Sequence, residues 1–259
     1  MDLKRVMAIL LVVGLVAVGC GSKDEDEGFG QGTGGGSNTT ASAPAALGTA
    51  SITGKVTLTG KAPAAAVIAM DADPVCKSQH ATSPKDETVV VDSKGDLANV
   101  FVYVEDGAGS TPAPTTPVTL LQKGCMYSPH VFGIQVGQPL EIVNGDPTLH
   151  NVHCMAVTND AFNVGQPSQN MATEKKFTKP EVLVKFKCDV HGWMHCAAGV
   201  VTNPFYSVSG ADGTFKISQL PKGTYTLVAV HEKYGESQPQ TVTLADGASQ
   251  AVNFTFAAQ

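Results

Sequence analysis

The sequence of 259 residues predicts an all-β protein with two β-sandwiches. Stretches of alternating apolar and polar residues have the period of two that is expected of half-buried strands. Several of these stretches are rich in β-branched and aromatic residues, and clusters of Gly, Pro, Asn and Asp separate them. A hydrophobic content of 42% provides enough apolar material for two small cores or one large one.

The first twenty residues predict a signal peptide rather than part of the fold. Two basic residues precede an apolar run over residues 6–18, and Gly19 and Cys20 follow it. This is the pattern of a secretory signal with a lipoprotein-type cleavage site, and the apolar run is short for the alternative, a transmembrane helix. We therefore expect cleavage before Cys20, which becomes lipidated. The resemblance to Gram-negative lipoproteins with Gly21 after the cysteine favours an outer-membrane anchor, on the periplasmic side or the cell surface.

Residues 21–47 predict a flexible linker. They are mostly Gly, Ser, Thr and Ala with a short acidic run at 24–27, and they show no apolar periodicity. We interpret the acidic run as a solvated spacer rather than as an interaction site. The net charge of -6 at pH 7 argues against a nucleic-acid partner. Separately, the lipid on Cys20 is the only contact with a membrane that we expect.

Residues 48–109 predict the first strands. Residues 51–58 alternate with a period of two, and residues 100–104 form a β-branched and aromatic run. Residues 89–91 offer a further short strand between them. A Pro- and Gly-rich loop over residues 105–117 then leads to the next part of the chain.

Three potential metal ligands lie close together near residue 190. Cys188, His191 and Met194 are spaced at i, i+3 and i+6, between predicted strands over 182–186 and 197–201. The triplet is therefore expected on a loop that joins two strands. A thiolate, an imidazole and a thioether suit copper, because the blue-copper arrangement is a trigonal His2Cys site with a weak axial Met.

A second histidine is needed, and His150 is the candidate. A strand over residues 140–143 is followed by the turn sequence Asn-Gly-Asp-Pro at 144–147, and His150 opens the next predicted strand. This strand would bring an imidazole from elsewhere in the sheet to the Cys188 loop.

The motifs C-x2-H-x2-M and H-N-V-H resemble those of the cupredoxins, the plastocyanin-like blue copper proteins, and are most similar to the amicyanin branch. Residues 126–129 and 137–140 also resemble the opening strands of that family, so the likeness covers about residues 115–203. The resemblance implies a Greek-key β-sandwich that binds one type 1 copper ion. It implies four ligands, which are His150, Cys188, His191 and Met194.

The resemblance also implies a role for Asn151, whose amide would connect the His150 and Cys188 loops and hold both ligands in place. Asp189 and Val190 differ from the Thr-Pro pair that amicyanin has between its Cys and His. A carboxylate beside the thiolate is expected to affect the reduction potential rather than the choice of metal.

The last part of the chain resembles a different family. D-G-x-F at residues 212–215 and L-P-x-G-x-Y at 220–225 are similar to the second half of a carboxypeptidase regulatory-like, transthyretin-like β-sandwich. The motif G-x-V-x-x-x-G at residues 54–60 is similar to its first half. We therefore predict one sandwich formed by residues 48–109 and 204–259, split by a cupredoxin domain over residues 110–203. Two sequential domains are the alternative.

The cysteines indicate an oxidising compartment. Apart from Cys20 and Cys188, the sequence has four, which allow three pairings. We expect Cys154 to pair with Cys196, because both leave the metal site on strands at a similar depth, and this leaves Cys76 with Cys125. One alternative is that Cys154 and Cys196 are free buried thiols. Another is a second metal site formed with their neighbours His153 and His195.

The four-ligand set predicts electron transfer rather than catalysis, because it leaves no open coordination position for a substrate. A thiol enzyme with Cys188 as nucleophile would leave Met194 without a role. A Cu(I) carrier that uses the same ligands is the main alternative. A surface lipoprotein whose regulatory-like sandwich binds carbohydrate or protein is compatible with either function.

A redox partner protein is expected, and the family resemblance implies that it docks beside His191. Pro147, Gly192 and Trp193 would form an apolar patch with Leu149 beneath it. The alternative for Trp193 is a place in the core. We assign ordinary structural roles to His80, His130, His231, Met126, Met155 and Met171.

Overall fold

The structure is a computed structural model that describes residues 47–258. The predicted signal peptide, Cys20 and all but the last residue of the predicted linker lie outside this range. The described residues contain eighteen strands and one five-residue helix, so the predicted all-β class is confirmed. No helix within residues 47–258 is long and apolar enough to cross a membrane.

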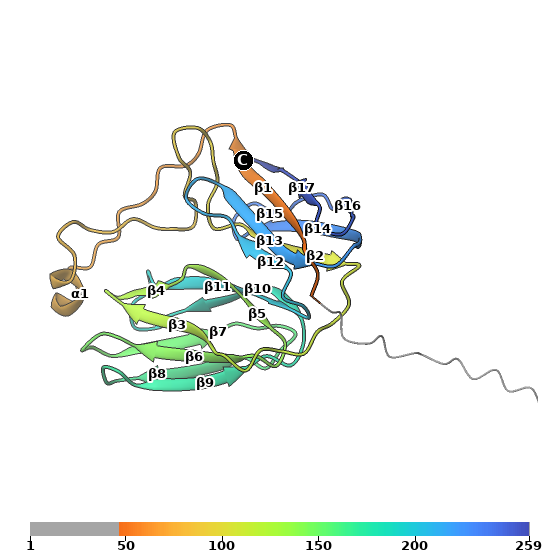
Figure 1. The fold of residues 1–259 in the computed structure, drawn as a ribbon. Helices are drawn as coiled ribbons and strands as arrows, with labels where there is room; N and C mark the ends of the chain where they lie inside the picture. Colours follow the sequence, from red (N-terminus) through yellow and green to blue (C-terminus); the bar gives the residue numbers. More distant parts are fainter. Residues whose placement is uncertain (1–46, 259) are drawn as a thin grey trace, which may run out of the picture. The chain divides into compact units, whose positions relative to one another are not determined.

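Strands from both ends of the described chain form one pair of sheets, which we call the terminal sandwich (Figure 1). In one sheet β1 pairs with β13, β17 and β18. In the other sheet β2 pairs with β12 and β14, and β14 also pairs with β15 and β16. The strands are β1 (Ala50–Thr59), β2 (Phe101–Asp106), β12 (Tyr206–Val208), β13 (Thr214–Leu220), β14 (Gly223–His231), β15 (Gly235–Glu236), β16 (Gln240–Leu244), β17 (Ser249–Ala251) and β18 (Phe254–Ala257).

Strands from the middle of the chain form a second pair of sheets, the central sandwich. One sheet has the order β5-β11-β10-β7-β8 and the other has the order β4-β3-β6-β9. The strands are β3 (Val118–Lys123), β4 (Met126–Ser128), β5 (Val131–Gln135), β6 (Pro139–Asn144), β7 (His150–Cys154), β8 (Phe162–Gln166), β9 (Ala172–Lys176), β10 (Glu181–Lys187) and β11 (His195–Val201). The domain boundaries drawn from the sequence stay a prediction.

Each sandwich has its own apolar core, as alternation along the strands requires. In β1, for example, Ile52, Val56 and Leu58 are buried in the core of the terminal sandwich. A third cluster joins strands of the two sandwiches to each other. Its buried members are Phe101, Tyr103, Val131, Val201, Val228 and Val230.

Part of the connection between β1 and β2, residues 60–100, leaves the terminal sandwich (Figure 1), whereas Leu97 and Val100 belong to its core. It contains the short helix α1 (Pro74–Ser78), and its residues Ile68, Met70 and Cys76 are buried in the core of the central sandwich. The predicted strand at residues 89–91 is wrong, because Val91 forms only an isolated bridge, to Leu97. The connection is otherwise irregular, and it carries residues that reach the candidate metal centre.

Candidate metal centre

The predicted ligand loop is the connection between β10 and β11. Cys188 directly follows β10, and the loop closes tightly because the Cys188 N–H donates to the Met194 carbonyl (3.0 Å) and the Met194 N–H donates to the His191 carbonyl (2.9 Å). His150 is the first residue of β7, as its position after the turn predicted. Since β7 pairs with β10, the sheet register places His150 beside this loop.

The structure brings three predicted ligands together. The Nδ1 atoms of His150 and His191 are 3.0 Å apart, and the His191 N–H donates to the Cys188 sulfur at 3.3 Å. One donor atom from each of these residues lies within 4.8 Å of the other two. Met194 is fully buried and belongs to the same apolar cluster as Cys188. The donor atoms therefore converge inside the protein at one end of the central sandwich.

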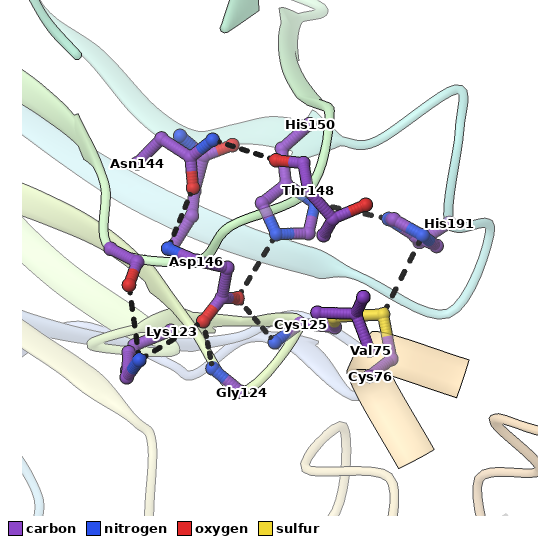
Figure 2. A network of polar contacts seen from close by, with 12 residues as sticks. Val75, Cys76, Lys123, Gly124, Cys125, Asn144, Asp146, Thr148, His150 and His191 are labelled. Carbon is purple, nitrogen blue, oxygen red and sulfur yellow. Dashed lines mark hydrogen bonds and ion pairs between the residues drawn. A yellow bond between two sulfur atoms is a disulfide. The ribbon is translucent and has the colours of Figure 1, made fainter. Parts of the chain in front are cut away.

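The far side of the His150 ring is held by a buried carboxylate. His150 Nε2 donates to Asp146 Oδ2 at 3.0 Å, and Asp146 also accepts the backbone N–H groups of Gly124 (3.0 Å) and Cys125 (2.7 Å). Lys123 Nζ lies 3.4 Å from the same carboxylate. Figure 2 shows Asp146 at the centre of these contacts. Because a carboxylate only accepts, it fixes the proton of His150 on Nε2.

The far side of the His191 ring is held in a similar way by Asp73. His191 Nε2 donates to Asp73 Oδ2 at 3.0 Å, and Thr148 Oγ1 donates to the same oxygen at 3.2 Å. The other oxygen of Asp73 caps α1 by accepting the N–H of Val75 (2.8 Å). The sulfur of Cys76 lies 3.6 Å from His191 Nε2 (Figure 2).

These contacts make the site a good fit for a metal ion. Since both Nε2 atoms donate to carboxylates, the Nδ1 atoms of neutral His150 and His191 direct lone pairs toward each other across 3.0 Å. A cation between them removes this conflict. Carboxylates that orient the far nitrogen of ligand histidines are a general feature of metal sites.

Burial and hydrogen bonds act in opposite directions on the ionisable groups of the site. Burial disfavours the charged forms, but the hydrogen bonds from His150 and from the N–H groups of Cys125 and Gly124 hold the pKa of Asp146 well below its ordinary value. Burial would likewise raise the pKa of the Cys188 thiol, yet the neighbouring His150 ring and the backbone N–H groups around the sulfur lower it. The thiolate, which is the form that binds metals, is therefore favoured.

Asn151 spans the two ligand segments. Its Oδ1 atom accepts the N–H of Asp189 (2.7 Å) and lies 3.3 Å from the Cys188 sulfur, while its Nδ2 atom donates to the Asp189 carboxylate (3.1 Å). The carboxylate of Asp189 is also paired with Lys187 (3.0 Å) and with His153 (3.0 Å). The hydrogen bonds from Lys187 and Asn163 hold the pKa of Asp189 below its ordinary value. The negative charge of Asp189 is thus compensated by Lys187 and by hydrogen bonds from neighbouring side chains.

The cysteines differ in part from the prediction. Cys76 and Cys125 form a disulfide, whereas Cys154 and Cys196 are free and buried, so the predicted bridge between them is wrong. The reason is the strand order: both cysteines are in register with Phe186 of β10, which separates β7 from β11. Two strand spacings amount to about 9–10 Å, which is too far for a disulfide.

The alternative of a second metal site formed by these cysteines with His153 and His195 is also wrong. Both thiols belong to the central core, while His153 pairs with Asp189 and His195 pairs with Asp86, each at 3.0 Å. Because neighbouring residues of a strand point to opposite faces of the sheet, the histidines cannot share a site with the adjacent cysteines.

The predicted docking patch is only partly formed. Pro147 and Gly192 are exposed, but Leu149 is 44% exposed rather than lying beneath the patch. Trp193 is half-buried against the central core and donates from Nε1 to the Cys125 carbonyl at 3.0 Å. His191 is only 4% exposed, because Asp73 and Cys76 cover its ring edge. The route of an electron through an exposed His191 edge therefore has no support.

The contacts of Asp73 and Asp146 with the ligand histidines were not predicted from the sequence. Asp146 lies in the turn four residues before His150, and Asp73 precedes Pro74, which is a typical signal for the start of a helix. These signals locate a turn and a helix cap, but they do not reveal contacts with the histidines. The contact between Asp73 and His191 joins residues 118 positions apart.

A family model and several solved structures are similar to parts of this chain. A family model of the carboxypeptidase regulatory-like domain matches residues 199–257. Solved structures similar to this chain include a Cu-containing nitrite reductase from Thermus scotoductus SA-01, with 24% identity over 36% of this chain and 24% of that chain and a TM-score of 0.31. The chain thus spans about a quarter of the length of that enzyme.

Two smaller copper proteins are covered more fully. A purple cupredoxin from Nitrosopumilus maritimus is 22% identical over 32% of this chain and 98% of that chain, with a TM-score of 0.28. A Cu(I) amicyanin mutant is 19% identical over 32% of this chain and 81% of that chain, with a TM-score of 0.29. The chain is therefore similar to a regulatory-like domain over one part and to cupredoxins over another.

Proposed function

We propose that this protein binds one copper ion through His150, Cys188, His191 and Met194 and transfers electrons. The observation that carries the proposal is the convergence of two imidazole Nδ1 atoms, 3.0 Å apart, with the Cys188 sulfur in a buried site. Copper bound by such a set cycles between Cu(I) and Cu(II), since the sulfur ligands favour the first state and the imidazoles accept the second. A site closed by four protein ligands has no position for a substrate, so the proposal includes no catalysis.

The protein contributes rigidity and exclusion of water. Asp146 and Asp73 fix both imidazoles, and Asn151 fixes the loop that carries Cys188. The ligand side chains of His150, Cys188 and Met194 are at most 2% exposed. A pre-organised site of this kind changes little when the oxidation state changes, which favours fast electron transfer.

Addition of Cu(II) tests the proposal. The protein should acquire intense visible absorption from thiolate-to-copper charge transfer, with narrow copper hyperfine splitting, and Cys188→Ala should abolish both. Cys154→Ala is the matched control, because Cys154 is also a free buried thiol but does not belong to the group of donor atoms around His150 and His191. A colourless protein with the spectra of ordinary square-planar Cu(II) would refute the blue-copper assignment.

Replacement of the fourth ligand tests its weak axial role. Met194→Leu should keep the copper and the visible absorption while raising the reduction potential, measured by protein-film voltammetry. Loss of copper from this variant would make Met194 a principal ligand instead.

A Cu(I) carrier is the second candidate, and the covered edge of His191 favours it because neither ligand imidazole, His150 or His191, has an exposed edge for electron exit. The two functions differ in kinetics. An electron carrier should exchange electrons rapidly between its Cu(I) and Cu(II) forms while retaining the ion. A carrier should instead release Cu(I) quickly to a competing chelator and exchange electrons slowly.

The proposal also includes an unidentified redox partner. Support for a docking surface comes from Leu149 and Val190, which precede the two histidine ligands and are 44% and 48% exposed. Leu149→Asp should keep the visible absorption but slow electron self-exchange, measured by NMR line broadening. Self-exchange at the wild-type rate would exclude this side chain from the docking surface.

We further propose, from the sequence, that Cys20 is lipidated and anchors the protein outside the cytoplasm at the outer membrane. Cys20→Ser should prevent lipid attachment and remove the protein from the membrane fraction. Contact of the regulatory-like sandwich with carbohydrate or protein is part of the same proposal. Binding of the full chain to a glycan array tests the carbohydrate contact.

A further inference from the structure

A second group of histidines and carboxylates connects the central and terminal sandwiches. It consists of His130, His195 and Glu232, and one donor atom of each lies within 4.8 Å of the other two. His130 directly precedes β5, His195 opens β11, and Glu232 directly follows β14. The first two residues belong to the central sandwich and the third belongs to the terminal sandwich.

The carboxylate of Glu232 lies between the two rings. Its Oε1 atom is hydrogen-bonded to His130 Nε2, and its Oε2 atom lies 3.8 Å from His195 Nδ1. The two imidazoles meet edge to face with their centroids 5.0 Å apart. His130 is 6% exposed, while the side chains of Glu232 and His195 are 13% and 30% exposed. The group is therefore largely buried but open on the His195 side.

Asp86 determines which nitrogen of His195 faces Glu232. His195 Nε2 donates to Asp86 Oδ2 at 3.0 Å, so neutral His195 has its lone pair on Nδ1. This lone pair then faces the Glu232 carboxylate, and neither group can donate to the other. A carboxylate thus orients the far nitrogen of His195 as Asp146 orients that of His150. A bound cation or a second proton on His195 would resolve the contact.

We propose that His130, His195 and Glu232 form a binding site for a divalent zinc-type ion, separate from the copper site. Two imidazole nitrogens and one carboxylate oxygen are a usual zinc set, whereas Ca²⁺ and Mg²⁺ prefer oxygen ligands alone. The ion takes the place of the proton between His130 and Glu232 and contacts Nδ1 of His195. Asp86 is a positioning residue, since it acts through His195.

A cavity adjoins the site at His130, and solvent can supply a fourth ligand. His130 lines a cavity of about 600 Å³ together with Lys85 and Glu87. Three protein ligands leave one coordination position for water. Because the ligands come from both sandwiches, the ion fastens one sandwich to the other.

Metal counting on the full-length protein tests the proposal. The protein is first given one equivalent of copper, so that the Cys188 site is filled, and is then dialysed against Zn²⁺. We expect one zinc per chain in addition to the copper, with unchanged visible absorption. Glu232→Gln should lower the zinc affinity by on the order of 100-fold, and Asp86→Asn should lower it by about 10- to 100-fold.

Glu87→Gln is the matched control, because it removes a negative charge from the same cavity without removing a ligand. It should bind zinc as the wild type does. If Glu232→Gln fails to fold, His195→Gln gives the same readout at a more exposed position. Equal zinc affinity in Glu232→Gln and Glu87→Gln, no zinc uptake after copper, or zinc that displaces copper one for one would each overturn the proposal.

The test is independent of the proposed function. If the protein takes up no copper, the metal-free protein is dialysed directly, and Glu232→Gln should still lose one zinc relative to wild type. Failure of the copper proposal and failure of the zinc proposal are thus separate results.

Discussion

The two imidazoles of the candidate metal centre are oriented alike but by different parts of the chain. Each donates from Nε2 to a carboxylate at 3.0 Å. For His150 the acceptor is Asp146, four residues away and fully buried in the central sandwich. For His191 it is Asp73, 118 residues away on the connection between β1 and β2, with 20% of its side chain exposed.

This difference divides the site into a local half, which is His150 with Asp146, and a remote half, which is His191 with Asp73. The local half is complete once the turn before β7 and the loop after β3 have formed. The remote half exists only when the α1 segment packs against the central sandwich, to which the Cys76–Cys125 disulfide fastens it. The free energy of unfolding should depend most on the disulfide, which holds the whole α1 segment. It should depend more on the fully buried Asp146 than on the partly exposed Asp73.

Removal of the disulfide should have the largest effect. The bridge closes a loop with a sequence separation of 49, so Cys76→Ser with Cys125→Ser should lower the free energy of unfolding by about 4 kcal/mol on the chain-entropy argument. Urea unfolding of the metal-free protein measures the loss. Reductant should have the same effect on wild type and on Cys154→Ala, since Cys154 is unpaired. A loss well below 1 kcal/mol would mean that the α1 segment is held by other contacts.

Asp146→Ala should follow, with a loss of about 3 kcal/mol. It leaves the buried N–H groups of Gly124 and Cys125 without an acceptor, and each such group costs about 1–3 kcal/mol. The same urea titration applies, and copper affinity should fall because His150 loses its orienting partner. Unchanged copper affinity would show that the ring is held by packing alone.

Asp73→Ala should cost less, about 2 kcal/mol. It removes the cap of α1, which contributes about 1 kcal/mol, and the acceptor of His191, whose site is more open to water. Asp73→Asn is the control, since asparagine also caps helices and should recover the part of the loss that belongs to α1. If Asp73→Ala destabilises the protein more than Asp146→Ala, the division into a local and a remote half is incorrect.

Glu181, a carboxylate outside the metal centre, serves as a comparison. Its replacement should lower the free energy of unfolding less than the changes above. Glu181 accepts the N–H groups of Val157 (2.6 Å), Thr158 (3.1 Å) and Asn159 (2.9 Å). Burial opposes the charge, but these hydrogen bonds hold the pKa of Glu181 below its ordinary value of 4.5. The stabilisation is therefore present above that value and is lost as the pH falls through the folded-state pKa.

Glu181→Gln should thus lower the free energy of unfolding by about 1 kcal/mol at neutral pH. The difference from wild type should vanish in acid, which urea unfolding across a pH series measures. A difference that is independent of pH would mean that the shape of the side chain matters rather than its charge.

The sequence predicts the candidate ligands of the site better than the carboxylates that orient them. The spacing of Cys188, His191 and Met194 and the turn before His150 are visible in the sequence because they lie on single loops. Asp73 is not predictable from it, because its contact with His191 depends on where an irregular connection packs. The Cys154–Cys196 error has a similar cause, since depth along two strands does not reveal that β10 lies between them.

The role of His130 and His195 could not be predicted for the same reason. His130 has no companion at ligand spacing in the sequence, and Glu232 contacts both histidines only because β14 ends beside β5 and β11. A class of fold can be inferred from periodicity, which is a local property. Clusters assembled from several segments require the packing itself.

The pairing of β1 has a consequence for the order in which the chain folds. All partners of β1 in its sheet, β13, β17 and β18, lie after residue 213, whereas the last strand of the central sandwich ends at Val201. If the chain becomes available for folding from its N-terminal end onward, the central sandwich has all its strands first, because domains fold as units. The earliest strand of the described chain is thus among the last to acquire its neighbours. Until then, its unpaired edge needs protection from other chains.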